Sequence, residues 1–251
     1  MPGCCSPFVG AANQQFNQKK VAQELERYRA KGPGPTTLLL ADGIAQSGTL
    51  SGTVLDVGSG IGGLTFALLE RGATSAVAVD AATEYIDVAR EEARRHGRAD
   101  AIRFVHADFV AAASDLPSAS IVTLDRVVCC YPSCEQLLDA ALGRAERCVA
   151  LSYPRDIWYV RAGMMLENGR RWLARNSFRT FVHPLRTIED SMRRAGSRYR
   201  ADAKRGCGQW TSMCGGEPAV ECPSPCVRRS GAIALSCANG LQLCPNRSRT
   251  H

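Results

Sequence analysis

The sequence has no long apolar stretch, no N-terminal targeting pattern and no basic run interleaved with aromatic residues. No segment approaches the roughly 18 apolar residues of a membrane-spanning helix, so we expect no membrane span. The first five residues, Met-Pro-Gly-Cys-Cys, lack the charged and apolar regions of a signal peptide. A cytoplasmic location is therefore expected, with the cysteines kept reduced.

Aromatic residues are also scarce, at 6% of the 251 residues. The net charge of +7 comes mainly from arginines, but these are spread along the chain, so a nucleic-acid partner is not indicated. Hydrophobic residues make up 45% and charged residues 22%, which is ordinary for a soluble enzyme of one domain with or without a tail. These values do not indicate an oligomeric state.

Residues 54–63, Val-Leu-Asp-Val-Gly-Ser-Gly-Ile-Gly-Gly, are the most informative stretch. They read as a buried strand followed by a glycine turn, and residues 64–71 read as a helix. Such a turn leaves a crevice at the carboxyl end of the strand, where α/β proteins bind ligands. The next strand, 75–79, ends on Asp80, twenty residues after Gly60, where an acid can accept hydrogen bonds from both hydroxyls of a ribose.

Strands and helices then alternate along the chain. Strand patterns at 75–79, 102–106, 121–124 and 148–152 are separated by helical patterns, including 83–96 and one that Ser133 and Gln136 would cap. Short connections of this kind imply right-handed crossovers and a mostly parallel sheet, so the fold class is α/β.

Two cofactors fit a glycine turn followed by a ribose acid. Gly58, Gly60 and Gly63 satisfy G-x-G-x-x-G, so an NAD(P)-dependent Rossmann dehydrogenase is one alternative. Asp56 argues against it, because its carboxylate would repel a pyrophosphate over the turn. S-adenosylmethionine has no phosphate, and its ammonium and sulfonium groups suit an acid.

The stretch Leu-Asp-Val-Gly-Ser-Gly at 55–60, with Asp80, resembles the first two motifs of class I S-adenosylmethionine-dependent methyltransferases. Segments 24–33, 124–132, 151–158 and 178–184 resemble a bacterial group often likened to magnesium-protoporphyrin O-methyltransferase. This resemblance covers about residues 16–196. It implies a Rossmann-like three-layer αβα sandwich, S-adenosyl-L-methionine as cofactor and a small-molecule acceptor. The porphyrin enzymes have a His before the Tyr of the fourth-strand motif, whereas this chain has Cys130.

The resemblance also implies roles for individual residues. The expected cofactor-binding set is Asp56, Gly58, Gly60, Asp80, Ala81, Asp108, Phe109 and Asp125. Asp108 would accept the adenine amino group and Phe109 would lie along the ring. Asp125 would face the methionine part and the acceptor. The alternative for Asp108 and for Asp125 is a helix cap.

Methyl transfer proceeds by in-line attack of the acceptor on the methyl group, so positioning and desolvation carry most of the catalysis. A base helps only an acceptor that still holds its proton, and Tyr131 and His183 are the catalytic candidates. The helix expected over 156–175 could line an apolar acceptor pocket, although core packing is the favoured interpretation. A protein that binds the cofactor without turnover is a further alternative.

We expect three regions: an N-terminal helical cap (1–45), the cofactor-binding domain (46–196) and a Cys-rich, aperiodic tail (197–251). The cap would contain helices over 13–31 and 36–44, the second capped by Thr36 or Thr37. The tail contains six of the twelve cysteines. We interpret it as disordered sequence read out of frame relative to its relatives, with a zinc site as the alternative. The sheet would then have about five parallel strands and an exposed edge.

Overall fold

The computed structural model describes residues 6–194, 198–202 and 232–237 of the chain. The strands are β1 (Thr53–Val57), β2 (Ser75–Asp80), β3 (Ile102–His106), β4 (Ala119–Asp125), β5 (Ala145–Tyr153), β6 (Arg198–Asp202) and β7 (Ala232–Cys237). The α-helices are α1 (Pro7–Gln15), α2 (Gln18–Lys31), α3 (Pro35–Gln46), α4 (Gly63–Glu70), α5 (Thr83–Arg95), α6 (Phe109–Ala112), α7 (Cys134–Leu142), α8 (Trp158–Leu173) and α9 (Leu185–Arg194). No helix within these ranges is long and apolar enough to cross a membrane.

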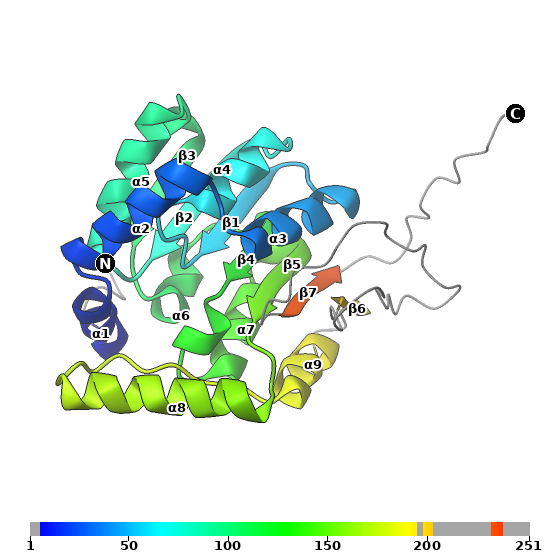
Figure 1. Ribbon diagram of the computed structural model, residues 1–251. Coiled ribbons are helices and arrows are strands. Elements are labelled where there is room, and N and C mark those ends of the chain that lie inside the picture. Colours follow the sequence, from blue (N-terminus) through cyan, green and yellow to red (C-terminus); the bar gives the residue numbers. More distant parts are fainter. Residues whose placement is uncertain (1–5, 195–197, 203–231, 238–251) are drawn as a thin grey trace, which may run out of the picture.

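The strands form one sheet in the order β3-β2-β1-β4-β5-β7-β6 (Figure 1). β1 to β5 are parallel, and β1 pairs with both β2 and β4. The chain moves from β1 to β2 and β3 and then returns to the other side of β1. The strand order therefore reverses between β1 and β4, and this is where open α/β sheets bind ligands. The expected Rossmann-like fold is confirmed.

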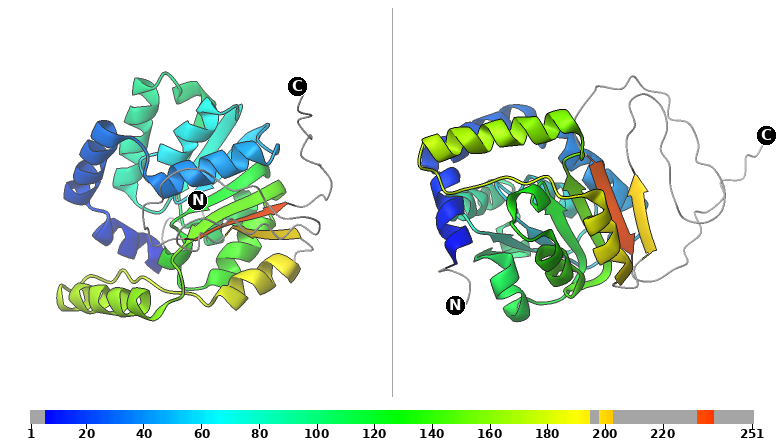
Figure 2. Two further views of the ribbon diagram at one scale, coloured as in Figure 1. Left: turned by 45° about the vertical axis from the view of Figure 1, so that its right-hand side comes forward. Right: turned by 90° about the horizontal axis from the view of Figure 1, so that it is seen from below.

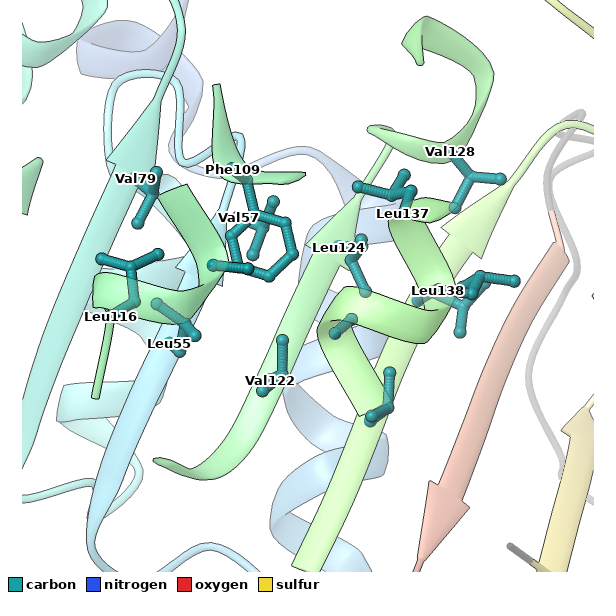
Figure 3. Packing of buried hydrophobic residues seen from close by; sticks show 14 of the residues in the cluster. Leu55, Val57, Val79, Phe109, Leu116, Val122, Leu124, Val128, Leu137 and Leu138 are labelled. Atoms are coloured by element: carbon teal, nitrogen blue, oxygen red, sulfur yellow. The ribbon is translucent and has the colours of Figure 1, made fainter. Parts of the chain in front are cut away.

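Buried apolar side chains cover both faces of the parallel strands, as expected for a sheet between two helical layers. Leu55 and Val57 of β1 belong to a cluster that extends to α6, α7 and α9 (Figure 3). Val54, on the opposite face, belongs to a second cluster with residues of α3, α4 and α5. Figure 2 shows the three resulting layers from two further directions.

The N-terminal helices begin and end at other residues than expected. The single helix expected over 13–31 is wrong, because α1 ends at Gln15 and α2 begins at Gln18. Asn17 separates them and accepts a hydrogen bond from the Lys20 N–H as the N-cap of α2. The expected cap at Thr36 or Thr37 is also wrong, because Gly34 is the N-cap of α3 and Pro35 follows it.

The expected open edge at β5 is wrong. β7 pairs antiparallel with β5 from Tyr153↔Ala232 to Cys148↔Cys237, and β6 pairs antiparallel with β7. The apolar run that becomes β7 was visible in the sequence, but Arg-Tyr-Arg-Ala-Asp of β6 shows no apolar alternation. Charged side chains are typical of edge strands, which hides them from a search for hydrophobic periodicity. The interpretations of residues 203–231 and 238–251 lie outside the described residues.

The apolar side chains of helix α8 neither line an acceptor pocket nor pack in the core, which were the two interpretations of this helix. None of its residues is buried, and only Arg171 of this helix lines the cavity described below. The polar side of α8 is tied to the segment that follows it, where the Asn168 side-chain amide donates to the Thr180 carbonyl at 2.7 Å. The apolar side chains are left in solvent.

Candidate functional site

The turn between β1 and α4 adopts a backbone conformation that requires glycine. φ is +65° at Gly58, +55° at Gly60 and +89° at Gly62. A Cβ on Gly58 would lie 2.4 Å from Cγ2 of Val127, in the loop after β4. The Gly58 and Ser59 N–H groups donate to the Val79 carbonyl at 2.7 and 3.1 Å, which fixes the turn to the end of β2.

Asp80, the last residue of β2, holds the same turn through its side chain. Oδ2 accepts the Gly60 N–H at 2.9 Å, and Oδ1 accepts the Ala82 N–H at 2.8 Å. Burial raises the pKa of this carboxyl to about 6, although hydrogen bonds from the backbone N–H groups of Ala82, Gly60 and Ala81 oppose the rise. A carboxylate has about four acceptor positions, so these contacts leave capacity for a ligand hydroxyl.

Asp56 lies at the end of β1 beneath the turn and is almost fully buried. Thr65 Oγ1 donates to Oδ2 at 2.6 Å, and Thr123 Oγ1 donates to Oδ1 at 2.8 Å. Burial raises the pKa of Asp56 to about 6 against the effect of these hydrogen bonds. Sequence reasoning missed both threonines. The signal for Thr123 is the sheet register, which pairs it with Asp56 once β4 is known to lie beside β1.

Asp125 lies at the end of β4 and is not a helix cap. Its Oδ2 accepts from Thr37 Oγ1 at 2.6 Å, and its Oδ1 accepts from Ser152 Oγ at 2.5 Å. Thr37 belongs to α3, so this carboxylate ties the N-terminal helices to the sheet. Ser152 is the register partner of Asp125 in β5. The Arg126 guanidinium is 3.7 Å from Asp125 Oδ2.

Asp108 follows β3 and caps α6, because its Oδ1 accepts the Val110 N–H at 3.1 Å. The cap anticipated as an alternative is therefore present. The Tyr131 hydroxyl lies 3.4 Å from the other carboxylate oxygen of Asp108. Ala81, which follows β2, and Phe109, which follows β3, are buried and line the cavity described below.

Of the two catalytic candidates, His183 contacts the backbone of Tyr131 with its side chain and does not contact the Tyr131 phenol. The His183 Nε2–H group donates to the Tyr131 carbonyl oxygen at 3.1 Å, and the imidazole stacks on Phe181. Burial, with the Asp108 carboxylate beside it, raises the pKa of Tyr131 to about 12. The Tyr131 phenol therefore keeps its proton at neutral pH.

Two thiols and two guanidinium groups lie near Tyr131. Cys129 and Cys130 have their sulfur atoms 3.7 Å apart, and both thiols contact the Arg126 carbonyl oxygen at 3.4 Å. The hydrogen bond from Cys130 lowers the pKa of Cys129, and the charges of Arg126 and Arg171 act in the same direction. Cys130 and both arginines line the cavity.

Helices α1 and α2 form the outer wall. The Phe8 ring lies 4.9 Å from that of Tyr131, and the Phe16 ring 5.1 Å from that of Tyr85. The Tyr85 hydroxyl donates to Glu24 of α2 at 2.5 Å. Gln14 of α1 donates through Nε2 to the Arg175 carbonyl at 2.8 Å, which ties the wall to the end of α8.

These groups surround one cavity of about 780 Å³. All the predicted site residues except Asp108 and His183 line it. The acids Asp56, Asp80 and Asp125 line this cavity, and so do Arg126, which lies beside Asp125, and Arg171. The reversal of strand order thus brings the ends of β1, β2 and β4 to a single polar site.

The known proteins that resemble this chain in sequence or structure include methyltransferases. Residues 54–150 match the model of a methyltransferase domain family. None of the curated proteins matches the chain. Magnesium protoporphyrin IX methyltransferase from Synechocystis PCC 6803, solved with bound SAH, is similar in structure with a TM-score of 0.62 and 16% identity, over 92% of this chain and 100% of that one. An O-methyltransferase family protein from Burkholderia thailandensis gives 0.60 and 15%, over 88% of this chain and 63% of that one.

A doubly wound sheet whose strand order reverses beside a glycine turn has the Rossmann-like architecture, in which ligands bind at that reversal. Residues 54–150 match a methyltransferase domain family, and the fold of the described chain is that of solved methyltransferases. The matches give no support to the dehydrogenase alternative.

Proposed function

We propose that this enzyme transfers the methyl group of S-adenosylmethionine to a small-molecule acceptor within the 780 Å³ cavity. The observation that carries the proposal is that one cavity contains both the Asp80–glycine turn and a wall formed by Tyr131, Cys130 and Arg171. A donor at the turn and an acceptor at that wall would share one enclosed space. The volume lies in the upper part of the usual range for ligand pockets, about 300–1,000 Å³.

The donor is placed by the remaining hydrogen-bond capacity of the buried acids. The ribose hydroxyls would donate to the free lone pairs of Asp80, and the adenine ring would lie against Ala81 and Phe109, with Asp108 at its amino group. The methionine part would pass over Gly60, where the nearest atom to an added Cβ would be Cε1 of Tyr85 at 4.0 Å. Its ammonium would face the negative charge of Asp56 and Asp125.

The residues near the acceptor would position and desolvate it rather than remove a proton from it. With a pKa of about 12, the Tyr131 phenol is a hydrogen-bond donor at neutral pH. His183 uses Nε2–H to hold the Tyr131 backbone, so we assign it as a positioning residue. The sulfonium is a good leaving group, and alignment within the cavity supplies most of the remaining rate.

The acceptor end contains two guanidinium groups, Arg126 and Arg171, which are paired with Asp125 and Glu167. The Arg171 guanidinium also lies 5.6 Å from the centre of the Phe178 ring. A flat, acidic acceptor would find charge and an aromatic surface there. The Synechocystis neighbour is named for magnesium protoporphyrin IX, which makes porphyrins suitable first members of an acceptor panel.

The test combines binding with product detection. Titration calorimetry should show tight binding of S-adenosylmethionine and S-adenosylhomocysteine and none of NAD. Transfer of a radiolabelled methyl group to one member of a panel of acidic and neutral acceptors would then establish turnover. Binding without product across acceptors that a matched methyltransferase accepts would instead support a cofactor-binding protein, and NAD binding would contradict the proposal.

A further inference from the structure

The most exposed apolar surface of the described chain is one face of α8. Seven large apolar side chains of the described residues are strongly exposed, and six of these belong to α8: Trp158, Tyr159, Met165, Leu166, Trp172 and Leu173. They are between 53% and 80% exposed. At about 100° per residue, all six fall within an arc of about 140°. This set is called the α8 apolar face below.

The α8 apolar face is free of the rest of the described chain. Figure 1 shows α8 along the outer margin of the molecule, and the view from below in Figure 2 shows it along the upper edge. Its polar side is the one that holds the protein, through Asn168 and Arg171 on Thr180. A flat surface could therefore approach the apolar face along the whole helix.

The charges around the α8 apolar face have one predominant sign. Residues 155–175 contain five arginines and two acids, a net charge of +3. Arg161 pairs with Asp156 and Arg171 with Glu167. Arg155, Arg170 and Arg175 form no ion pair with another described residue. On the helix, Arg161 and Arg170 flank the apolar arc on opposite sides, where long side chains can reach phosphate groups while the arc is immersed.

We propose that α8 docks this face onto an anionic lipid surface. A helix with an apolar arc bordered by arginines and with a tryptophan near each of its two ends has the pattern of helices that lie in the interface plane of a bilayer. Anionic headgroups complement the net charge of the segment. Because Arg171 belongs to the same helix, docking brings the Tyr131 end of the cavity next to the bilayer.

A second copy of the chain fits the α8 apolar face less well than an anionic bilayer does. Pairing two α8 apolar faces would bring the unpaired arginines of two copies together, whereas anionic headgroups would neutralise them.

Vesicle sedimentation tests the proposal with the full-length protein. It should co-sediment with vesicles of equal parts phosphatidylcholine and phosphatidylglycerol, less with phosphatidylcholine alone, and less at high salt. Two of the three tryptophans lie on the face, so lipid should shift their emission to the blue. The double variant Trp172→Ser, Leu173→Ser should bind at least about tenfold more weakly.

Matched variants locate the effect. Leu185→Ser changes an exposed apolar side chain on α9 and should bind within about twofold of the unchanged protein. Arg170→Glu should weaken binding more than Arg103→Glu, which makes the same change in net charge on β3. Circular dichroism and S-adenosylhomocysteine binding check that each variant is folded.

Four results would overturn the proposal. The first is no binding to anionic vesicles, and the second is equal losses for the α8 and control variants. The third is a dimer, measured by light scattering, that the Trp172→Ser, Leu173→Ser variant dissociates, because a second copy would then be the occupant. Tryptophan emission that is already blue-shifted without lipid, and that lipid does not change, would show that the face is covered in the protein itself, and would equally contradict the proposal.

Discussion

At the scale of single residues, Asp56 and Asp80 make the free energy of unfolding depend on pH. In the folded protein the pKa of each rises from 3.8 to about 6, chiefly through burial. The native state therefore holds more protons than the unfolded chain between about pH 4 and 6. Each group lowers the free energy of unfolding as pH rises through that window, by up to about 3 kcal/mol, and has no further effect above it.

Replacing Asp80 should make stability less dependent on pH. The unfolding free energy of Asp80→Asn should fall less steeply than that of the unchanged protein between pH 4 and 6.5, because the variant has no carboxyl to titrate there. Urea unfolding at several pH values measures the slopes. Asp100→Asn, an exposed acid, is the control and should leave the slope unchanged. Equal slopes for Asp80→Asn and the unchanged protein would show that folding does not raise the pKa of Asp80.

Asp56 is expected to act on the methionine part of the cofactor. Asp56→Asn removes the negative charge but keeps the size of the side chain beside Thr65 and Thr123. S-adenosylmethionine should bind about tenfold more weakly, whereas adenosine should be nearly unaffected. Titration of both ligands separates the roles. Equal losses would mean that Asp56 serves only to hold its two threonines.

At the scale of elements, the close approach of the glycine turn to the β4 loop can be separated from its backbone conformation. Gly58 and Gly97 have nearly the same φ, +65° and +63°, but a Cβ meets Val127 at 2.4 Å only at Gly58. Gly97→Ala should cost about 1–2 kcal/mol for the left-handed backbone alone. Gly58→Ala should cost clearly more and weaken S-adenosylhomocysteine binding.

The second substitution Val127→Ala, added to Gly58→Ala, should restore part of both losses because it removes the contacting methyl groups. Thermal unfolding and titration of the three variants give the comparison. Equal costs for Gly58→Ala and Gly97→Ala would contradict the close approach of these two loops.

The elements also show where sequence patterns are informative. The strands from β1 to β5, and the glycine turn, were predicted because parallel strands buried on both faces are apolar runs and because only glycine permits the turn. The partners of the acids were not predicted. Thr123 and Ser152 contact Asp56 and Asp125 only because β4 lies between β1 and β5, and spacing along the chain does not reveal that order.

At the scale of the whole molecule, hydrophobic periodicity failed where polar residues hold the structure. β6 has two arginines and an aspartate among five residues, so it did not read as a strand. Helix α8 has enough tryptophan, leucine and methionine to read as a core helix, yet those side chains are exposed. An apolar pattern indicates that a surface will be covered but does not say by what.

Deleting residues 197–251 tests the contribution of the final strands. The deletion removes β6 and β7 and exposes the edge of β5, where Cys148 to Tyr153 are buried. The truncated chain should melt at least about 5 °C lower and aggregate with increasing concentration. Deleting only residues 238–251 keeps both strands and serves as the control. A shortened chain that stays monomeric and equally stable would show that β5 does not need its antiparallel neighbour.

The most direct test of S-adenosylmethionine binding at the end of β2 is titration of S-adenosylhomocysteine into the unchanged protein and Asp80→Ala. We predict one molecule bound per chain and a ten- to hundredfold weaker affinity for the variant, because a buried, hydrogen-bonded charge is lost, at a cost of about 1.5–3 kcal/mol. Circular dichroism confirms that the variant is folded. An unchanged affinity in a folded Asp80→Ala protein would contradict this placement of the cofactor.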